Sequence, residues 1–133
     1  MKKTASWLIL GFCLLALTSC HSTERRAGDV AEQFLKAYYS ADYAKAATLA
    51  TPSFAGHLSK GAALQDRLPD EIAQKMKEAV AQTSFKIVSV KADKEAGTAV
   101  VYYELSAPTL DGPMPKQLLL KLEGRSAAVD GIE

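Results

Sequence analysis

The stretch DVAEQFLKAYYSADYAKA, residues 29–46, decides where the helical part of the fold begins and how it is divided. Apolar side chains recur at helical spacing in its first half: Val30, Phe34, Ala37 and Tyr38. This spacing predicts a helix from about residue 29 to residue 40. Asp29 fits the N-cap of that helix, and Glu32 fits the partner position of a capping box. Asp42 fits the cap of a second, short helix, which predicts two helices separated by a tight break.

Two further helices follow in the sequence. Thr51 and Pro52 provide an N-cap followed by proline at the first helical position, which predicts a short helix over residues 52–60 that ends before Gly61. A fourth helix is expected over residues 69–82. Its first turn is acidic, which complements the helix dipole. Its apolar face comprises Ile72, Met76, Ala79 and Val80.

The apolar period changes after residue 83, where strand patterns begin. In SFKIVSVKAD, residues 84–93, the alternation slips between Ile87 and Val88, which indicates a β-bulge or a strand with two covered faces. The segment TAVVYYELSA, residues 98–107, alternates cleanly. One of its faces comprises Ala99, Val101, Tyr103 and Leu105, and the other comprises Val100, Tyr102 and Glu104. Tyr103 is therefore the expected core ring of this strand.

Two more strands complete the pattern. KQLLLKLEG, residues 116–124, alternates in the same way, and RSAAVDGIE, residues 125–133, predicts a weaker last strand. Helices come first and consecutive strands follow. This order predicts an α+β domain in which the N-terminal helices pack on one face of a mostly antiparallel, four-stranded sheet.

The segment before this domain has the layout of an export signal. A basic start is followed by the apolar run WLILGFCLLAL, residues 7–17, and then by the small residues Thr18 and Ser19. A retained membrane-spanning helix is one alternative, but the run is shorter than the ~20 apolar residues that cross a bilayer. A plain secretory signal with a chance cysteine is the other. Residues 21–27, HSTERRA, show no periodicity and are expected to form a tether, with an extra helical turn as the alternative.

The four residues LTSC, Leu17 to Cys20, resemble the lipobox of bacterial lipoproteins: an aliphatic residue, two small residues and cysteine. The resemblance implies cleavage between Ser19 and Cys20, a diacylglycerol thioether on Cys20 and acylation, for example with palmitate, of the freed amine. Residues 1–19 are then the signal peptide, residues 20–27 a lipidated tether and residues 28–133 the domain. His21 stands where aspartate would favour the inner membrane, so we expect the outer membrane, facing the periplasm, if the cell has two membranes.

The run from Phe34 to Ala46, followed by a longer helix and four strands, resembles small bacterial lipoproteins with a nuclear transport factor 2-like domain. The resemblance covers most of residues 28–133. It implies a cone of helices on a curved sheet with a cavity between them, and pairing of two copies through the sheet as a homodimer. The chain departs from the family pattern at Ala127 and Ala128, where a large ring is expected.

Composition restricts the partners. The whole chain has a formal net charge of +1, and loss of Lys2 and Lys3 with the signal makes it weakly acidic. A nucleic-acid partner, which requires a basic patch, is therefore not expected. Cys13 is removed with the signal and Cys20 becomes a thioether, so the domain has no disulfide. We also expect no cofactor, and no metal site, since one histidine and scattered acids do not supply a ligand set.

Three candidate catalytic residues remain: Glu104, His57 and Tyr103. An isomerase or dehydratase would need an acid or histidine beside a tyrosine in a cavity, as the resemblance implies. The competing interpretation places Glu104 on a solvated face, His57 on the surface and the tyrosines in the core. The sequence favours a membrane-anchored domain that binds a small apolar ligand or an envelope protein without catalysis. The enzyme and a structural or dimerisation unit remain as alternatives.

Overall fold

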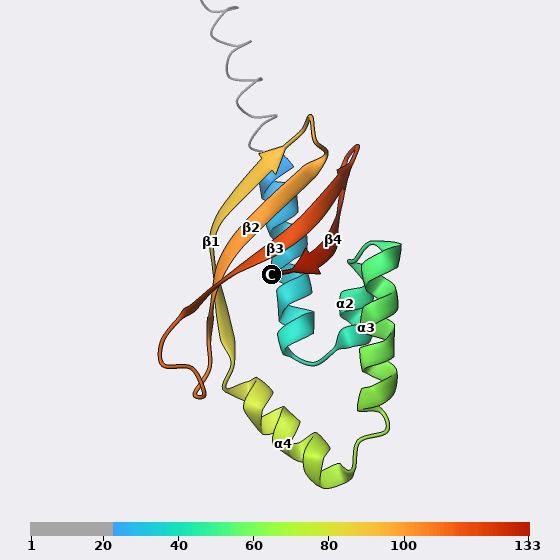
Figure 1. The fold of residues 1–133 in the computed structure, drawn as a ribbon, viewed down its shortest axis with the longest axis vertical. Helices are drawn as coiled ribbons and strands as arrows, with labels where there is room; N and C mark the ends of the chain where they lie inside the picture. Colours follow the sequence, from blue (N-terminus) through green and yellow to red (C-terminus); the bar gives the residue numbers. More distant parts are fainter. Residues whose placement is uncertain (1–22) are drawn as a thin grey trace, which may run out of the picture.

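The computed structural model describes residues 23–133, which form four helices and one sheet. The N-terminal helix is described over residues 23–39 and is followed by α2 (Tyr43–Thr48), α3 (Pro52–Gln65) and α4 (Asp70–Ala81). Figure 1 shows the N-terminal helix lying across one face of the sheet, with α4 at the far end of the molecule. The predicted signal and Cys20 lie outside the described residues. Within residues 23–133, no helix is long and apolar enough to cross a membrane.

The N-terminal helix begins earlier than predicted. Residues 23–28 are already helical, so the prediction of Asp29 as N-cap is wrong, and the alternative of extra helical turns holds for residues 23–27. Glu32 lies on the exposed side, where it forms an ion pair with Lys36 at 3.3 Å. The helix includes residues 23–28 because Ala27 is fully buried and extends the apolar face of the helix one turn toward the N-terminus. A single small residue among polar neighbours gives no visible period in the sequence.

The two middle helices start at the predicted caps. The Asp42 side chain accepts a hydrogen bond from the Lys45 amide at 3.2 Å, and the Thr51 hydroxyl accepts one from the Phe54 amide at 3.4 Å. The predicted end of α3 at Gly61 is wrong, because the helix continues to Gln65. Glycine weakens a helix without breaking it. Here a Cβ at position 61 would lie 3.8 Å from the Tyr43 ring, in ordinary contact.

The fourth helix forms where predicted but packs loosely. None of its residues is buried, and the side chain of Ile72 is 47% exposed. Its apolar face is therefore only partly covered by the rest of the domain. This loose packing leaves room between α4 and the other helices.

The sheet is an antiparallel meander with strand order β1-β2-β3-β4. Its strands are β1 (Ser84–Asp93), β2 (Thr98–Ser106), β3 (Met114–Glu123) and β4 (Ser126–Ile132). The predicted slip in β1 is a β-bulge: Ile87 pairs with Tyr103 and Ser89 with Tyr102, which leaves Val88 unpaired. The bulge returns Val90 to the core face and leaves Val88 58% exposed. One extra residue thus restores the alternation.

The last strand is held from both sides. On one side β4 pairs with β3, with a second irregularity that leaves Asp130 unpaired between Val129 and Gly131. On the other side, the Val129 amide donates to the Leu49 carbonyl at 2.9 Å, and the Val129 carbonyl accepts from the Thr51 amide at 2.8 Å. These two hydrogen bonds satisfy the backbone amide and carbonyl of Val129 at the edge of the sheet. They hold β4 in place although it has no large ring at Ala127 or Ala128.

The core lies between the N-terminal helix and the sheet. Its largest fully buried side chains are Tyr103, Phe34, Leu35, Leu118, Leu120, Val101 and Val129. The prediction that Tyr103 faces the helices is confirmed. The α+β class, with helices preceding a curved, unclosed antiparallel sheet, is confirmed as well.

Replacing Phe34 by alanine tests this core. Phe34 is fully buried and stacks on Tyr38 with ring centroids 5.7 Å apart. We expect Phe34→Ala to lower the free energy of unfolding by about 3–5 kcal/mol, because it removes a large buried ring and leaves a cavity. Urea denaturation of residues 21–133 measures this. Gln33→Ala, at an exposed position of the same helix, is the control, and an equal effect of both changes would contradict the packing.

Candidate functional site

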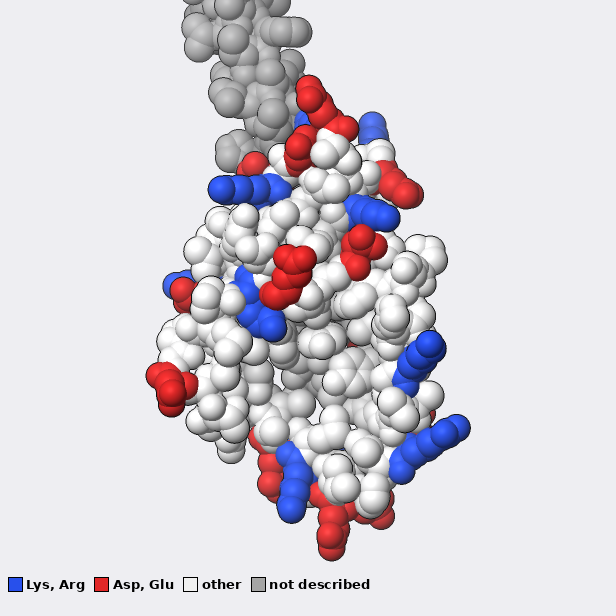
Figure 2. Space-filling model, in the orientation of Figure 1, with Lys and Arg blue, Asp and Glu red and all other residues white. Residues whose placement is uncertain are grey.

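A groove with apolar walls opens where three described helices approach the end of the N-terminal helix. We call it the helical groove, and its volume is about 430 Å³. It is lined by Tyr38, Tyr43, Phe54, His57, Leu58, Gly61, Leu64, Gln65, Leu68 and Met76. None of these residues is Asp, Glu, Lys or Arg. In Figure 2 the charged side chains of this half of the molecule lie mainly around its margins.

Aromatic contacts fix one wall of the helical groove. Tyr38, near the end of the N-terminal helix, meets the Tyr43 ring of α2 edge-on at 5.6 Å between centroids. Phe54 of α3 lies 5.9 Å from the fully buried ring of Phe34. The short break between the N-terminal helix and α2, where Ala41 has a φ of 60°, brings Tyr38 and Tyr43 together. This wall is preorganised because core residues hold its rings.

The opposite wall comes from α3 and α4 and is less constrained. Leu58 is buried, but Leu64 at the rim is 65% exposed, and Met76 is supplied by the loosely packed α4. The polar groups on the lining are the tyrosine hydroxyls, His57 and the Gln65 amide. Such a site offers large apolar contact with a few hydrogen-bonding groups, the usual composition of a small-molecule pocket.

A pair of tyrosines lies inside the core, between the N-terminal helix and β2. The hydroxyl oxygens of Tyr39 and Tyr103 are hydrogen-bonded at 2.9 Å. Burial raises the pKa of Tyr103 well above its usual value, and the hydrogen bond with Tyr39 raises it further. Burial also raises the pKa of Tyr39. Both hydroxyls are therefore neutral at ordinary pH, and one donates its proton to the oxygen of the other in a site with little water.

The structure does not bring the three candidate catalytic residues together. Glu104 follows Tyr103 on β2, so their side chains leave opposite faces of the sheet. His57 is exposed on α3 and belongs to the helical groove. The solvated interpretation of Glu104 agrees with its position on the face away from the helices. Within residues 23–133, no group of three or more His, Cys, Asp or Glu residues is placed to hold a metal ion.

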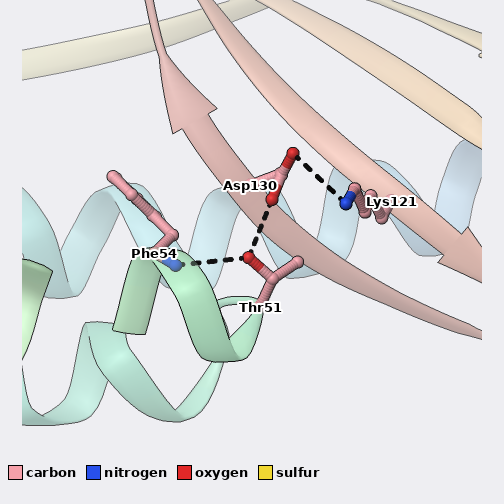
Figure 3. Close-up of polar contacts among 4 residues, drawn as sticks. All are labelled: Thr51, Phe54, Lys121 and Asp130. Atoms are coloured by element: carbon pink, nitrogen blue, oxygen red, sulfur yellow. Dashed lines mark hydrogen bonds and ion pairs between the residues drawn. The ribbon is translucent and has the colours of Figure 1, made fainter. Parts of the chain in front are cut away.

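Sequence reasoning missed a polar contact that positions α3. The Thr51 hydroxyl donates to Asp130 Oδ1 at 2.8 Å, and the other carboxylate oxygen lies 3.9 Å from Lys121 Nζ. Figure 3 shows these groups joining the start of α3 to β4 and β3. Thr51 was predicted only as a cap. Its second role depends on the unpaired position of Asp130, which no local pattern reveals.

The groove lining was also only partly predicted. The tyrosines do not share one role: Tyr38 and Tyr43 line the groove, whereas Tyr39 and Tyr103 form the buried pair. Leu64 and Leu68 lie between the predicted helices, and Met76 is predicted only as part of the apolar face of the fourth helix. The chain matches no family model, no curated protein and no solved structure.

Alkaline unfolding tests the buried tyrosine pair. Because the pKa of Tyr103 is higher in the folded protein than its ordinary value of 10, the unfolded chain releases this proton first. Stability from this group is fully present below about pH 10 and is lost as the pH rises above it. We therefore expect the stability difference between wild type and Tyr103→Phe to be constant at neutral pH and to shift in favour of the variant above about pH 10. Urea denaturation of both proteins from neutral pH to above about pH 10 measures this difference. A difference that stays the same across the whole range would contradict burial of the Tyr103 hydroxyl.

Proposed function

We propose that this chain is a lipid-anchored protein of a bacterial cell envelope whose domain binds a small apolar ligand, without catalysis, in the helical groove. The observation that carries the binding function is the groove itself. Its walls are aromatic and aliphatic, its lining has no ionised carboxylate or ammonium group, and Leu64 at its rim is largely exposed. Covering such a surface is favourable by about 25 cal/mol per Å² of apolar area removed from water.

The size and polarity of the groove restrict the ligand class. Its volume of about 430 Å³ lies within the usual range for small molecules, roughly 300–1,000 Å³. A charged ligand would lose hydration without gaining a counter-ion. The ligand we propose is therefore uncharged and mostly hydrocarbon, with one or two polar atoms that reach His57 or Gln65. A hydrophobic segment of an envelope protein is the alternative occupant.

The anchor is supported by the sequence from Leu17 to Cys20 and by the uncharged run before it. Two or three acyl chains hold a protein firmly, since each buried methylene contributes about 0.8 kcal/mol. The domain itself is proposed to be nuclear transport factor 2-like. The helices that precede a curved antiparallel meander support this proposal.

Cysteine substitutions in the full chain test the anchor. We expect Cys20→Ala to abolish acylation and to leave an uncleaved precursor, because the thiol is the acceptor that precedes cleavage. Cys13→Ala is the matched control: it removes the other cysteine, which lies within the apolar run, and should leave processing unchanged. Mass spectrometry of membrane fractions measures both. A cleaved, acyl-free protein from the wild type would contradict the proposal.

Filling the groove tests ligand binding. The readout is titration of residues 21–133 with N-phenyl-1-naphthylamine, an uncharged fluorescent aromatic probe. We expect Gly61→Leu to weaken its binding by at least about tenfold, equivalent to 1.4 kcal/mol. The fold should survive, because position 61 is helical and the added Cβ makes only ordinary contact with Tyr43.

Gly56→Leu is the control for that experiment. It makes the same change on the same helix, but a Cβ at position 56 meets nothing within 4 Å, and Gly56 does not line the groove. Binding should match the wild type. Equal binding by both variants, or no saturable binding by the wild type, would overturn the groove as the ligand site.

A further inference from the structure

The described part of the N-terminal helix lies close in sequence to the proposed lipid. Residue 23 is already helical, and only two residues separate it from Cys20. Whatever their conformation, three residue steps span at most about 11 Å. This inference rests on the proposed acylation of Cys20, which would then place the start of the helix within that distance of the diacylglycerol thioether. The predicted tether of residues 20–27 is thereby shortened to a few residues.

The start of this helix is fixed to the sheet. Ala27 is fully buried, and a Cβ at Gly28 would lie 3.5 Å from the Val90 side chain. Arg26 Nη1 donates a hydrogen bond to the Arg125 carbonyl in the β3–β4 turn at 2.8 Å. Residues 24–28 therefore move with the domain, so a short link at Cys20 limits the position of the whole domain.

Two turns of the sheet lie at this same end. Figure 1 shows the β1–β2 and β3–β4 turns beside the first described turns of the helix, and α4 at the opposite end. We call the surface made by residues 24–26, 94–97 and 123–126 the anchor end. Its charged side chains are Glu24, Arg25, Arg26, Lys94, Glu95, Glu123 and Arg125. Figure 2 shows both signs intermixed there.

We propose that the anchor end rests directly on the phospholipid headgroups and that the helical groove faces away from the bilayer. Headgroups such as phosphatidylethanolamine carry a phosphate and an ammonium group side by side, which complements a surface of mixed sign. Arginines suit the phosphates because their guanidinium groups bind them with two parallel hydrogen bonds. Tyr38 of the groove lies fifteen residues along the helix from Thr23, about 22 Å at 1.5 Å per residue.

Site-specific fluorescence quenching tests this orientation. Mature lipidated protein would have no free thiol, so a single introduced cysteine can be labelled with a fluorophore. Ala96→Cys places the label on the anchor end, and Gln74→Cys places it on α4; both positions are exposed. The proteins are reconstituted in vesicles of phosphatidylethanolamine and phosphatidylglycerol that contain lipid with a nitroxide on its headgroup.

We expect at least about twofold stronger quenching at position 96 than at position 74. Position 96 lies at the anchor end and position 74 on α4, at the opposite end of the molecule (Figure 1). The described N-terminal helix, which runs between these ends, is itself about 25 Å long. Equal quenching at both positions, or stronger quenching at position 74, would overturn the proposal. Flotation of the same vesicles separates this from failure of the anchor. Protein that does not float with the vesicles contradicts the lipidation, whereas floating protein without the contrast contradicts only the orientation.

A linker insertion tests whether the short connection sets the orientation. A Gly-Ser segment of about twelve residues, inserted between Ser22 and Thr23, behaves as a flexible chain and should reduce the contrast between positions 96 and 74. The same insertion at the exposed Gly112, in the β2–β3 connection, is the control and should leave the contrast unchanged. An undiminished contrast after the first insertion would show that the short connection does not orient the domain.

Discussion

The contact between one face of the N-terminal helix and the sheet is the interaction on which the other parts of the structure depend. Ala27 and Ala31 are fully buried and have no side chain beyond Cβ, so the helix backbone can approach the strands closely. Phe34 and Leu35 then fill the space further along the helix. On the sheet side, this contact requires every strand to present apolar residues to the same face. The bulge at Val88 is the adjustment that lets β1 do so despite its irregular sequence.

The helical groove is a consequence of how the remaining helices are attached. The start of α3 is tied to β4 by the backbone bridge at Val129 and by the hydrogen bond from Thr51 to Asp130. By contrast, none of the α4 side chains is fully buried, although its sequence has a clear apolar face. One wall is thus fixed by the core and the other is held weakly. Leu64 at the rim is 65% exposed, and a ligand of the kind proposed would remove it from water.

Much of the fold could be predicted because its determinants are local. Strand alternation placed Tyr103 in the core, and the slip at Val88 predicted a bulge. Errors arose where a local rule was overridden by packing: the face of the first helix extends to Ala27 beyond the apparent cap at Asp29, and α3 runs through Gly61. The groove could not be predicted as a unit, because its residues come from four helices whose relative positions depend on tertiary contacts.

The same reasoning explains how one set of tyrosines serves two purposes. Tyr38 and Tyr39 are neighbours on a helix, so their side chains diverge by about 100°. Tyr39 turns toward the sheet, where its hydroxyl meets that of Tyr103, and Tyr38 turns toward α2 and α3 and becomes a wall of the groove. The two rings still touch edge-on, with centroids 5.1 Å apart. The groove wall is therefore continuous with the core, and a ligand against Tyr38 would rest on the same packed helix whose other end lies nearest the proposed lipid anchor.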